Sequence, residues 1–558
     1  MTESPRTATA IDDVADEWVD TLVDLDPTLG TYIGRIENND RYGDLSPEGH
    51  EGYIEAVRKT RAELAALTPA DAVDQVTQAD LLSELDLELE FDHAQWHLRD
   101  LNVIESAVQN VRQVYDLMPT ATVDDWAVIA KRLAAVPNTL RGYATTLRQG
   151  VERGVVPARR QVVEAAGQIV RYTASDGFFA AFVADATADE GDLPASLARE
   201  LADSASAARV AYDELRDFLT GTLAPVASDA DAVGRDLYAL HSRRFLGATV
   251  DLDETYQWGR EELERMVAEQ TSIANEILPG ATVEEAVAHL EADPSRKLRG
   301  TEALQRWMQQ TSDRAVTELG ATHFDIPEQI RTIECMIAPT QEGGIYYTGP
   351  TDDFSRPGRM WWSVPEGVTE FDTWRELTTV YHEGVPGHHL QIAQAVHNRA
   401  ELNSWRRLLA GTSGHAEGWA LYAERLMQQL GYLDDPADRL GMLDGQRMRA
   451  ARVVLDIGVH LGKDRLDAQG VWDAGYALEF MRRNVNMPDE FVRFEVNRYL
   501  GWPGQAPSYK VGQRIWEQVR DAYRAHQGDA FDVKRFHKEA LDLGGVGLDT
   551  LRTALLKK

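Results

Sequence analysis

The segment from Tyr381 to His389 holds the residue types of a zinc-hydrolase helix in an unusual spacing. In the usual His-Glu-x-x-His signature, two histidines four residues apart bind the metal from one helical face, and the glutamate acts as general base. In this chain His382 and Glu383 begin the motif, but the position four residues after His382 is Pro386. His388 and His389 come later, so the metal-binding geometry needs an explanation.

A regular helix would not aim His382 and His388 at one ion, because six residues turn the side chain ~120° away from the starting face. His389 would return to within ~20° of that face but would lie ~10 Å further along the axis. Pro386 and Gly387 permit a kink or bulge, because proline removes a helical donor and glycine tolerates unusual backbone angles. We predict such a bulge, with His388 as the second ligand. The simpler alternative is a helix that ends before the bulge, followed by a turn with two surface histidines.

A metal site needs a third ligand, and thiolates do not supply it, since Cys335 is the single cysteine. Six of the 14 histidines lie between residues 382 and 460, and imidazole is the commonest metal ligand. Residues 415–424 read as a helix on which Glu417 and Glu424 stand two turns apart on one face. A carboxylate there completes a two-His, one-Glu site with an open position for water. The alternative is that both are solvated helix glutamates.

Other side chains are candidates to act on a substrate around such a site. Asp456 is expected to orient His460 or to pair with Arg452. Internal hydrogen bonds and ion pairs are the alternative for every candidate. Three side chains are candidates to donate a hydrogen bond to a tetrahedral oxyanion: Tyr509, His460 and Tyr347. Three others are candidates to hold a substrate carboxylate: Arg498, Lys510 and Arg356.

The first ~320 residues, which precede the motif, show long amphipathic segments at the helical period. Thr122-x-x-Asp125 and Thr282-x-x-Glu285 are typical of N-terminal capping boxes. This part of the chain is therefore predicted to be nearly all α. The clearest segments are 12–25, 53–67, 78–96, 122–151, 197–219 and 253–277.

The pattern changes after Phe324, where short segments rich in β-forming residues appear. Asp372 or Thr373, with Glu376 shortly after, predicts the start of the helix that leads into His382. A strand beside that helix would let an extended peptide pair with an open sheet edge. We therefore expect a small sheet next to the metal helix, with strands near 331–338, 345–348 and 360–364.

The domain organisation predicted from this change is a helical part over 1–320 that forms one wall of a cleft, followed by a catalytic part over 321–558. No linker or internal repeat separates them, so we expect one integrated domain. The mainly α class is the fold prediction from the residues themselves.

Composition excludes several functions. A chain of 558 residues with 43% hydrophobic residues can bury a large core. Its net charge of −34 argues against binding to nucleic acids or anionic membranes, which need basic patches. No run approaches the ~20 apolar residues of a membrane span, and the opening residues lack the layout of a secretory signal. We expect a cytoplasmic protein.

Five blocks of the sequence together form a recognisable pattern. In chain order they are Ser355-Arg356-Pro357-Gly358, His382 to Gln391, Glu417-Gly418-Trp419-Ala420-x-Tyr422-x-Glu424, Arg452-x-x-x-Asp456-x-Gly458-x-His460, and Arg498-Tyr499 with Pro503-Gly504-Gln505-Ala506-x-x-Tyr509-Lys510-x-Gly512. In these blocks the chain resembles the bacterial proteins catalogued as domain of unknown function 885, which are grouped with the gluzincin metallopeptidases. The resemblance covers most of the chain and is concentrated from about residue 330 onward.

The resemblance implies a zinc site of His382, His388 and Glu417, with Glu383 as general base for the attacking water. It implies a fold like that of the helical oligopeptidases, with a deep cleft between two mostly helical lobes. The expected function is a zinc metallopeptidase that cleaves short peptides. Two alternatives remain, a zinc hydrolase of a non-peptide amide or other small molecule and a non-catalytic helical binding protein.

Overall fold

The amphipathic segments of the first 320 residues form helices, as predicted. The structure, a computed structural model, describes residues 6–338 and 344–556. Thr122 and Thr282 cap their helices with the predicted capping boxes to Asp125 and Glu285. The helices of this part are α1 (Ala10–Leu25), α2 (Pro27–Tyr32), α3 (Pro47–Ala65), α4 (Ala72–His93), α5 (Ala107–Gln113), α6 (Val123–Arg153), α7 (Arg159–Thr173), α8 (Phe178–Ala184), α9 (Ala195–Phe218), α10 (Arg235–Leu246), α11 (Leu252–Ile277), α12 (Val283–Glu291) and α13 (Thr301–Thr322).

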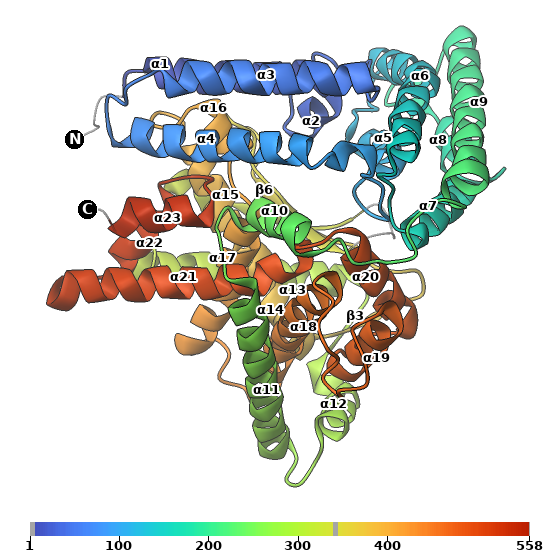
Figure 1. Cartoon of the computed structure of the whole chain (residues 1–558). Helices are drawn as coiled ribbons and strands as arrows, with labels where there is room; N and C mark the ends of the chain where they lie inside the picture. The colour runs from blue at the N-terminus through green and yellow to red at the C-terminus, as the bar shows by residue number, and fades with distance from the viewer. Residues whose placement is uncertain (1–5, 339–343, 557–558) are drawn as a thin grey trace.

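Among the described residues there are four apolar cores, and these helices contribute mainly to three of them. The first core joins α1, α3 and α4, and the second joins α5 to α9. The third contains α10 to α13 together with most of the chain after residue 374. In Figure 1, α1, α3 and α4 form the upper layer and α6 and α9 stand at its right-hand end. The change of core therefore falls near residue 230, although the composition of the sequence changes only after 320.

Polar contacts fasten the upper layer to the C-terminal part of the chain. Arg6 forms ion pairs with Asp12 and Asp71. Asp12 also accepts a hydrogen bond from Asn403, just before the short helix α16 (Ser404–Leu408). Arg406 of α16 donates to Thr77 of α4 at 3.2 Å. The N-terminal helices are thus fixed directly on the segment that follows the predicted metal motif.

A small sheet forms where it was predicted. Its strands are β4 (Ile333–Ile337), β5 (Ile345–Thr348) and β6 (Gly358–Trp362) in the order β4-β6-β5. β4 runs parallel to β6, and β5 runs antiparallel to it. Their buried side chains pack on α13. A second ladder, β3 (Lys297–Arg299) with β7 (Glu370–Asp372), ends directly at the predicted metal helix.

Glycines let the helices of the C-terminal part pack with their backbones close together. A Cβ atom on Gly418 would lie 2.4 Å from the carbonyl carbon of Gly512, so the helices that carry these residues meet there. The helices are α14 (Thr373–Glu383), α15 (His388–His397), α17 (Ser413–Gln429), α18 (Pro436–His460), α19 (Ala474–Asn484), α20 (Asp489–Gly501), α21 (Gln505–Gln527), α22 (Val533–Leu541) and α23 (Leu548–Leu556).

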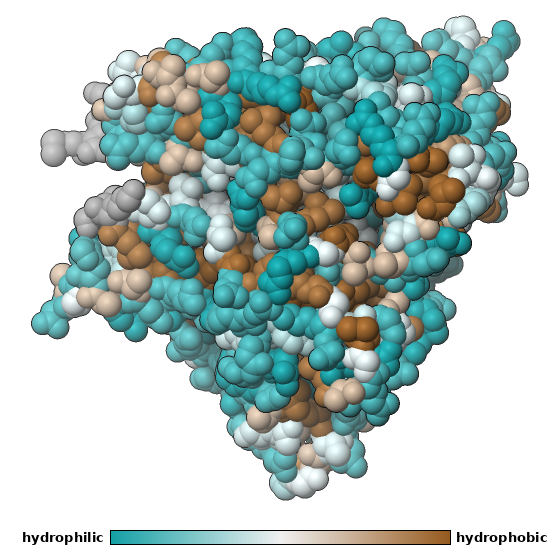
Figure 2. Space-filling model, in the orientation of Figure 1, coloured by the Kyte–Doolittle hydropathy of each residue, from teal (hydrophilic) through white to brown (hydrophobic). Residues whose placement is uncertain are grey.

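The face of the molecule in Figure 2 is mostly hydrophilic, in line with the charge of the chain. Figure 2 shows hydrophobic residues gathered mainly near the centre of this face, where α10 lies between the upper layer and the helices below. Among the described residues, no helix has the length and apolar character needed to cross a membrane.

Candidate metal centre

The helix is interrupted between the two halves of the metal motif. α14 ends at Glu383, a turn covers residues 384–387, and α15 begins at His388. The predicted bulge within a continuous helix is therefore corrected to two helices joined by a turn. The helix does end at this point, as the simpler alternative held, but its two histidines are buried and not at the surface.

Gly387 is required by the tightness of this turn. Its N–H donates to the Tyr381 carbonyl at 3.1 Å. A Cβ atom at this position would lie 1.9 Å from the carbonyl oxygen of His382. Only glycine avoids that overlap, so the backbone folds back on itself and His388 returns toward His382.

Trp419 ties the turn to α17. Its indole Nε1 donates to the Pro386 carbonyl at 2.9 Å and to the Gly387 carbonyl at 3.2 Å. Glu417 precedes Trp419 by two residues on the same helix. The indole of Trp419 therefore fixes the turn that orients His388 relative to the helix that carries the predicted third ligand.

His382, His388 and Glu417 converge on one point. The Glu417 Oε2 atom lies 3.3 Å from His382 Nε2 and 3.6 Å from His388 Nε2. Two ligand atoms that are each ~2.1 Å from one tetrahedral ion stand ~3.4 Å apart. Glu417 Oε2 is buried, and no hydrogen bond to it satisfies ordinary geometry within the described part of the chain. The donor set and its spacing fit a zinc ion.

Glu424 orients His382 from behind. Its Oε1 lies 2.8 Å from His382 Nδ1, and its Oε2 accepts a hydrogen bond from Gln446 at 2.9 Å. When Nδ1–H donates to this carboxylate, Nε2 can offer its lone pair to an ion placed between His382 and Glu417. Burial pushes the pKa of Glu424 up, but the hydrogen bond from His382 holds it below its usual value. The two glutamates of α17 thus have different roles, one facing the ion position and one supporting a ligand.

Glu383 lies beside the ligands without being required as one. Its carboxylate oxygen lies within 4.8 Å of ring nitrogens of His382 and His388. Burial raises the pKa of Glu383 above its usual value, while the two histidines oppose that rise. A buried carboxylate of raised basicity next to the ion position is suited to accept a proton.

His389 is not available to a metal. Its Nε2 is 2.7 Å from the Ile330 carbonyl, so that nitrogen donates a hydrogen bond. Its Nδ1 accepts from the Tyr347 hydroxyl at 2.9 Å. Gly358 makes room for this pair, because a Cβ atom there would lie 2.0 Å from the Tyr347 oxygen. The choice of His388 over His389 agrees with this geometry, and the predicted substrate role of Tyr347 is corrected to support of α15.

Tyr509 is near enough to Glu417 for the two to interact electrostatically, and its predicted role stays a prediction. Burial and the negative charge of Glu417 raise the pKa of Tyr509 to about 12. The guanidinium carbons of Arg452 and Arg449 lie 5.3 and 5.9 Å from its ring centroid. The phenol therefore keeps its proton and remains a candidate donor to an oxyanion.

His460 is not brought to the metal position. Its side chain is fully buried, and its Nε2 donates to the Tyr499 carbonyl at 3.0 Å. The Asp456 Oδ1 atom lies 3.9 Å from His460 Nε2, the pairing predicted for these residues, while Oδ2 accepts from the Tyr238 hydroxyl and from the N–H of Gly504. Both residues hold the turn before α21, so the catalytic role predicted for His460 is replaced by a structural one.

The three basic residues predicted to bind a substrate carboxylate are engaged internally. Lys510 is 2% exposed, and its ammonium lies 3.0 Å from Glu262. Arg356 donates to the Gly349 carbonyl at 2.9 Å. Arg498 lies 3.4 Å from Glu495. Lys510 is thus paired internally, Arg356 is bonded to backbone carbonyls and Arg498 keeps a longer contact, so a substrate role for the three stays a prediction.

Sequence reasoning missed the roles of Trp419 and Gln446. Trp419 belonged to a recognised block, but nothing in the sequence indicated that its indole would bind the turn carbonyls. Gln446 lies in an ordinary stretch of α18 and carried no signal. Its amide connects Glu424 to Lys510, which donates to it at 2.6 Å.

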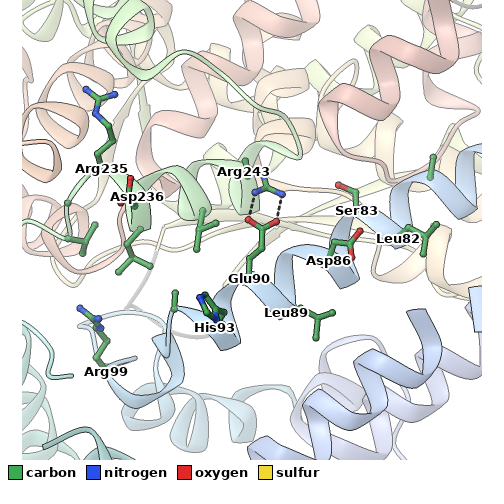
Figure 3. Close-up of a pocket in the computed structure, with 16 residues that line it drawn as sticks. Leu82, Ser83, Asp86, Leu89, Glu90, His93, Arg99, Arg235, Asp236 and Arg243 are labelled. Atoms are coloured by element: carbon green, nitrogen blue, oxygen red, sulfur yellow. Dashed lines mark hydrogen bonds and ion pairs between the residues drawn. The ribbon is translucent and has the colours of Figure 1, made fainter. Parts of the chain in front are cut away.

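A cavity lies elsewhere in the molecule. About 1170 Å³ opens between α4 and α10, and Arg243 of α10 pairs with Glu90 of α4 across it (Figure 3). Residues from Ala79 to Arg99 and from Val233 to Arg243 line it, and none of the predicted site residues is among them. The cavity and the metal position are therefore distinct places.

A second group of possible metal ligands does not fit an ion in its present arrangement. His50, Asp92 and His97 have ligand atoms within 4.8 Å of one another. The two imidazole rings are stacked at 3.5 Å with an interplanar angle of 18°. Lone pairs lie in the ring plane, so those of near-parallel stacked rings do not converge on one ion. The His50–Asp92 contact at 3.0 Å is read as a hydrogen-bonded pair.

Comparison with known proteins identifies the family. A family model described as "Bacterial protein of unknown function (DUF885)" matches residues 27–555. The chain therefore belongs to this family. No curated protein matches it.

Two solved structures share the fold over nearly their whole length. One, from Colwellia psychrerythraea, is described as a "putative lipoprotein"; it is 22% identical, with a TM-score of 0.83 and 98% of each chain covered. The other, from Shewanella oneidensis, is described as a "putative lipoprotein of unknown function". It is 16% identical, with a TM-score of 0.75 and 98% of this chain and 100% of that chain covered. These likenesses concern the fold, so the cytoplasmic location of this chain stays a prediction.

Proposed function

We propose that this member of the DUF885 family is a zinc-dependent hydrolase that cleaves short peptides. The observation that carries the proposal is the convergence of His382, His388 and Glu417, with ligand atoms 3.3 and 3.6 Å apart, beside the buried Glu383. The gluzincin character of the site is part of the proposal.

His382, His388 and Glu417 would hold the ion, with Glu424 keeping His382 in the required tautomer. When bound, zinc acidifies water and polarises the carbonyl of a substrate. Glu383 accepts the proton of the attacking water and returns it to the leaving amine. Tyr509 donates its phenolic hydrogen to the oxyanion that develops on the substrate carbonyl.

The test combines metal analysis with a digest. Purified protein is analysed for bound metal and is incubated with a pool of dipeptides and tripeptides and with a matching pool of N-acylated amino acids. Products are identified by mass spectrometry. We expect one zinc ion per chain, cleavage of peptides, loss of cleavage on chelation and recovery with zinc.

Glu383→Gln should keep the zinc and lose cleavage by ~10²-fold or more, since the general base is removed while the ligands remain. Glu366→Gln, at an exposed glutamate, is the control and should cleave normally. Absence of stoichiometric zinc would contradict the proposal. Cleavage of the N-acyl pool alone would move the substrate class away from peptides, and full activity in Glu383→Gln would remove the assigned mechanism.

A further inference from the structure

Arg449 differs from the other arginines around the site because no ion pair or hydrogen bond engages its guanidinium within the described residues, and its Nε is buried. Its neighbours Arg447 and Arg452 are both engaged, the former with Gln270 and the latter with Glu495. A half-buried guanidinium without such a bond is available to an anion from outside.

Arg449 is placed beside the reacting groups. It follows Gln446 by three residues, which puts both on one face of α18. Gln446 binds Glu424, whose other oxygen binds His382. Further along this face the Arg449 guanidinium carbon lies 5.9 Å from the Tyr509 ring.

The backbone leaves room for this guanidinium. A Cβ atom on Gly445 would lie 2.7 Å from Arg449 Nη1, so the guanidinium rests over a glycine one turn earlier in α18. The side chain is half-buried, which keeps part of it open to solvent. The carboxylates of Glu383, Glu424 and Asp444 interact electrostatically with this guanidinium, but none of them forms an ion pair or a hydrogen bond with it among the described residues. Glu417 faces the two histidines.

We infer that Arg449 binds a carboxylate of the substrate and so selects short peptides with a negative charge next to the scissile bond. A guanidinium offers two parallel N–H donors that match a carboxylate. The carboxylate is either the C-terminal one, which makes the enzyme an exopeptidase, or that of an acidic side chain. The selection of peptides for cleavage rests on the proposed function, whereas the binding of a carboxylate by Arg449 does not.

The test measures binding, so that it does not depend on turnover. Glu383→Gln protein is titrated by calorimetry with a pool of dipeptides and tripeptides as free acids, and with the same peptides as C-terminal amides. Each pool contains members with and without Asp or Glu. The titrations are repeated with Arg449→Gln in the same background, and with Arg447→Gln as the matched control on the same helix. Melting temperatures establish that all variants are folded.

Charge-assisted hydrogen bonds of this kind change affinity by about tenfold to a hundredfold. We expect that loss when the free acid is replaced by the amide, and the same loss when Arg449 is replaced. For the Arg449→Gln variant with the amide, the loss of affinity should be no greater than the loss from either change alone. Arg447→Gln should bind as the parent does. If amides bind well only when they contain Asp or Glu, the side-chain carboxylate is the one recognised.

Three outcomes would overturn the inference. These are equal binding of acids and neutral amides, an Arg449→Gln variant that weakens both alike, and no binding of any free acid. A protein that cleaves peptides but shows one of these outcomes keeps the proposed function and loses only the carboxylate site. A protein that binds free acids through Arg449 but cleaves nothing keeps the carboxylate site and loses the peptidase.

Discussion

At the scale of single residues, adjacent histidines have opposite roles. The rings of His382 and His388 lie 4.8 Å apart at an interplanar angle of 90°, whereas His389 points away to Ile330 and Tyr347. Burial lowers the pKa of His389 to about 4, so this imidazole stays neutral and keeps both hydrogen bonds. The difference between a ligand and a structural residue is thus one position in the chain.

The two histidines are expected to respond differently to substitution. His388→Ala should lose stoichiometric zinc, because one of three ligands is gone. His389→Ala should keep zinc, and its free energy of unfolding should fall by ~1–3 kcal/mol, since two buried hydrogen-bonding groups lose their partner. Metal analysis and denaturant unfolding of both variants check this. The reverse pattern of zinc loss would assign the metal to His389.

At the scale of elements, the turn between α14 and α15 depends on one glycine. In Gly387→Ala the new Cβ atom would lie 1.9 Å from a backbone oxygen. We expect a loss of ~2 kcal/mol or more in unfolding free energy, together with a loss of zinc. The control is Gly167→Ala in α7, where a Cβ atom meets nothing within 4 Å. Gly167→Ala should raise the unfolding free energy by ~0.5–1 kcal/mol, because alanine favours the helix over glycine. Equal effects of Gly387→Ala and Gly167→Ala on the unfolding free energy would show that the turn is not tight.

The first turn of α14 contains a carboxyl group that titrates near neutral pH. Burial raises the pKa of Glu376 to about 7. An unfolded glutamate has a pKa near ~4.3, so between these values the folded chain binds the proton more strongly and stability falls as pH rises. Glu376→Gln removes the charge. The unfolding free energy of this variant relative to the parent should therefore rise by ~1–2 kcal/mol between pH 5 and pH 8.

Thermal unfolding of the Glu376→Gln variant and of the parent at both pH values measures this growth. Glu366→Gln, whose carboxylate is exposed, should show none. A constant difference between parent and variant across the pH range would mean that Glu376 is ionised in the folded protein.

At the scale of the whole molecule, the candidate metal centre belongs to one of the four apolar cores among the described residues. α14, α15, α17 and α21 lie in the core shared by α10 to α13, while α6 to α9 have their own. Zinc should therefore slow amide hydrogen exchange in α14, α15 and α17 and leave α6 to α9 unchanged. Exchange followed by mass spectrometry with and without zinc tests this. Equal protection everywhere would mean that the cores unfold as one unit.

Much of the fold was predictable because its signals are local. The helix starts at Thr122 and Thr282 follow from side chains that bond to nearby backbone, and the long amphipathic helices follow from a repeat within each segment. The start of α14 was predicted at Asp372 or Thr373, and the helix does begin at Thr373 with Asp372 as its N-cap, although no side-chain hydrogen bond caps it. The division into cores was not predictable, since it depends on which helices pack together.

The sequence by itself determined the helical class, the small sheet, the family and the residue types of the site. It did not determine which side chains are free to act. Lys510, Arg356 and Arg449 are equivalent as cations in a sequence. Glu262 pairs with the first and a loop carbonyl accepts from the second, whereas no ion pair or hydrogen bond within the described part of the chain engages the third. Only the tertiary structure decided this, because each partner comes from a packing contact that the local sequence does not encode.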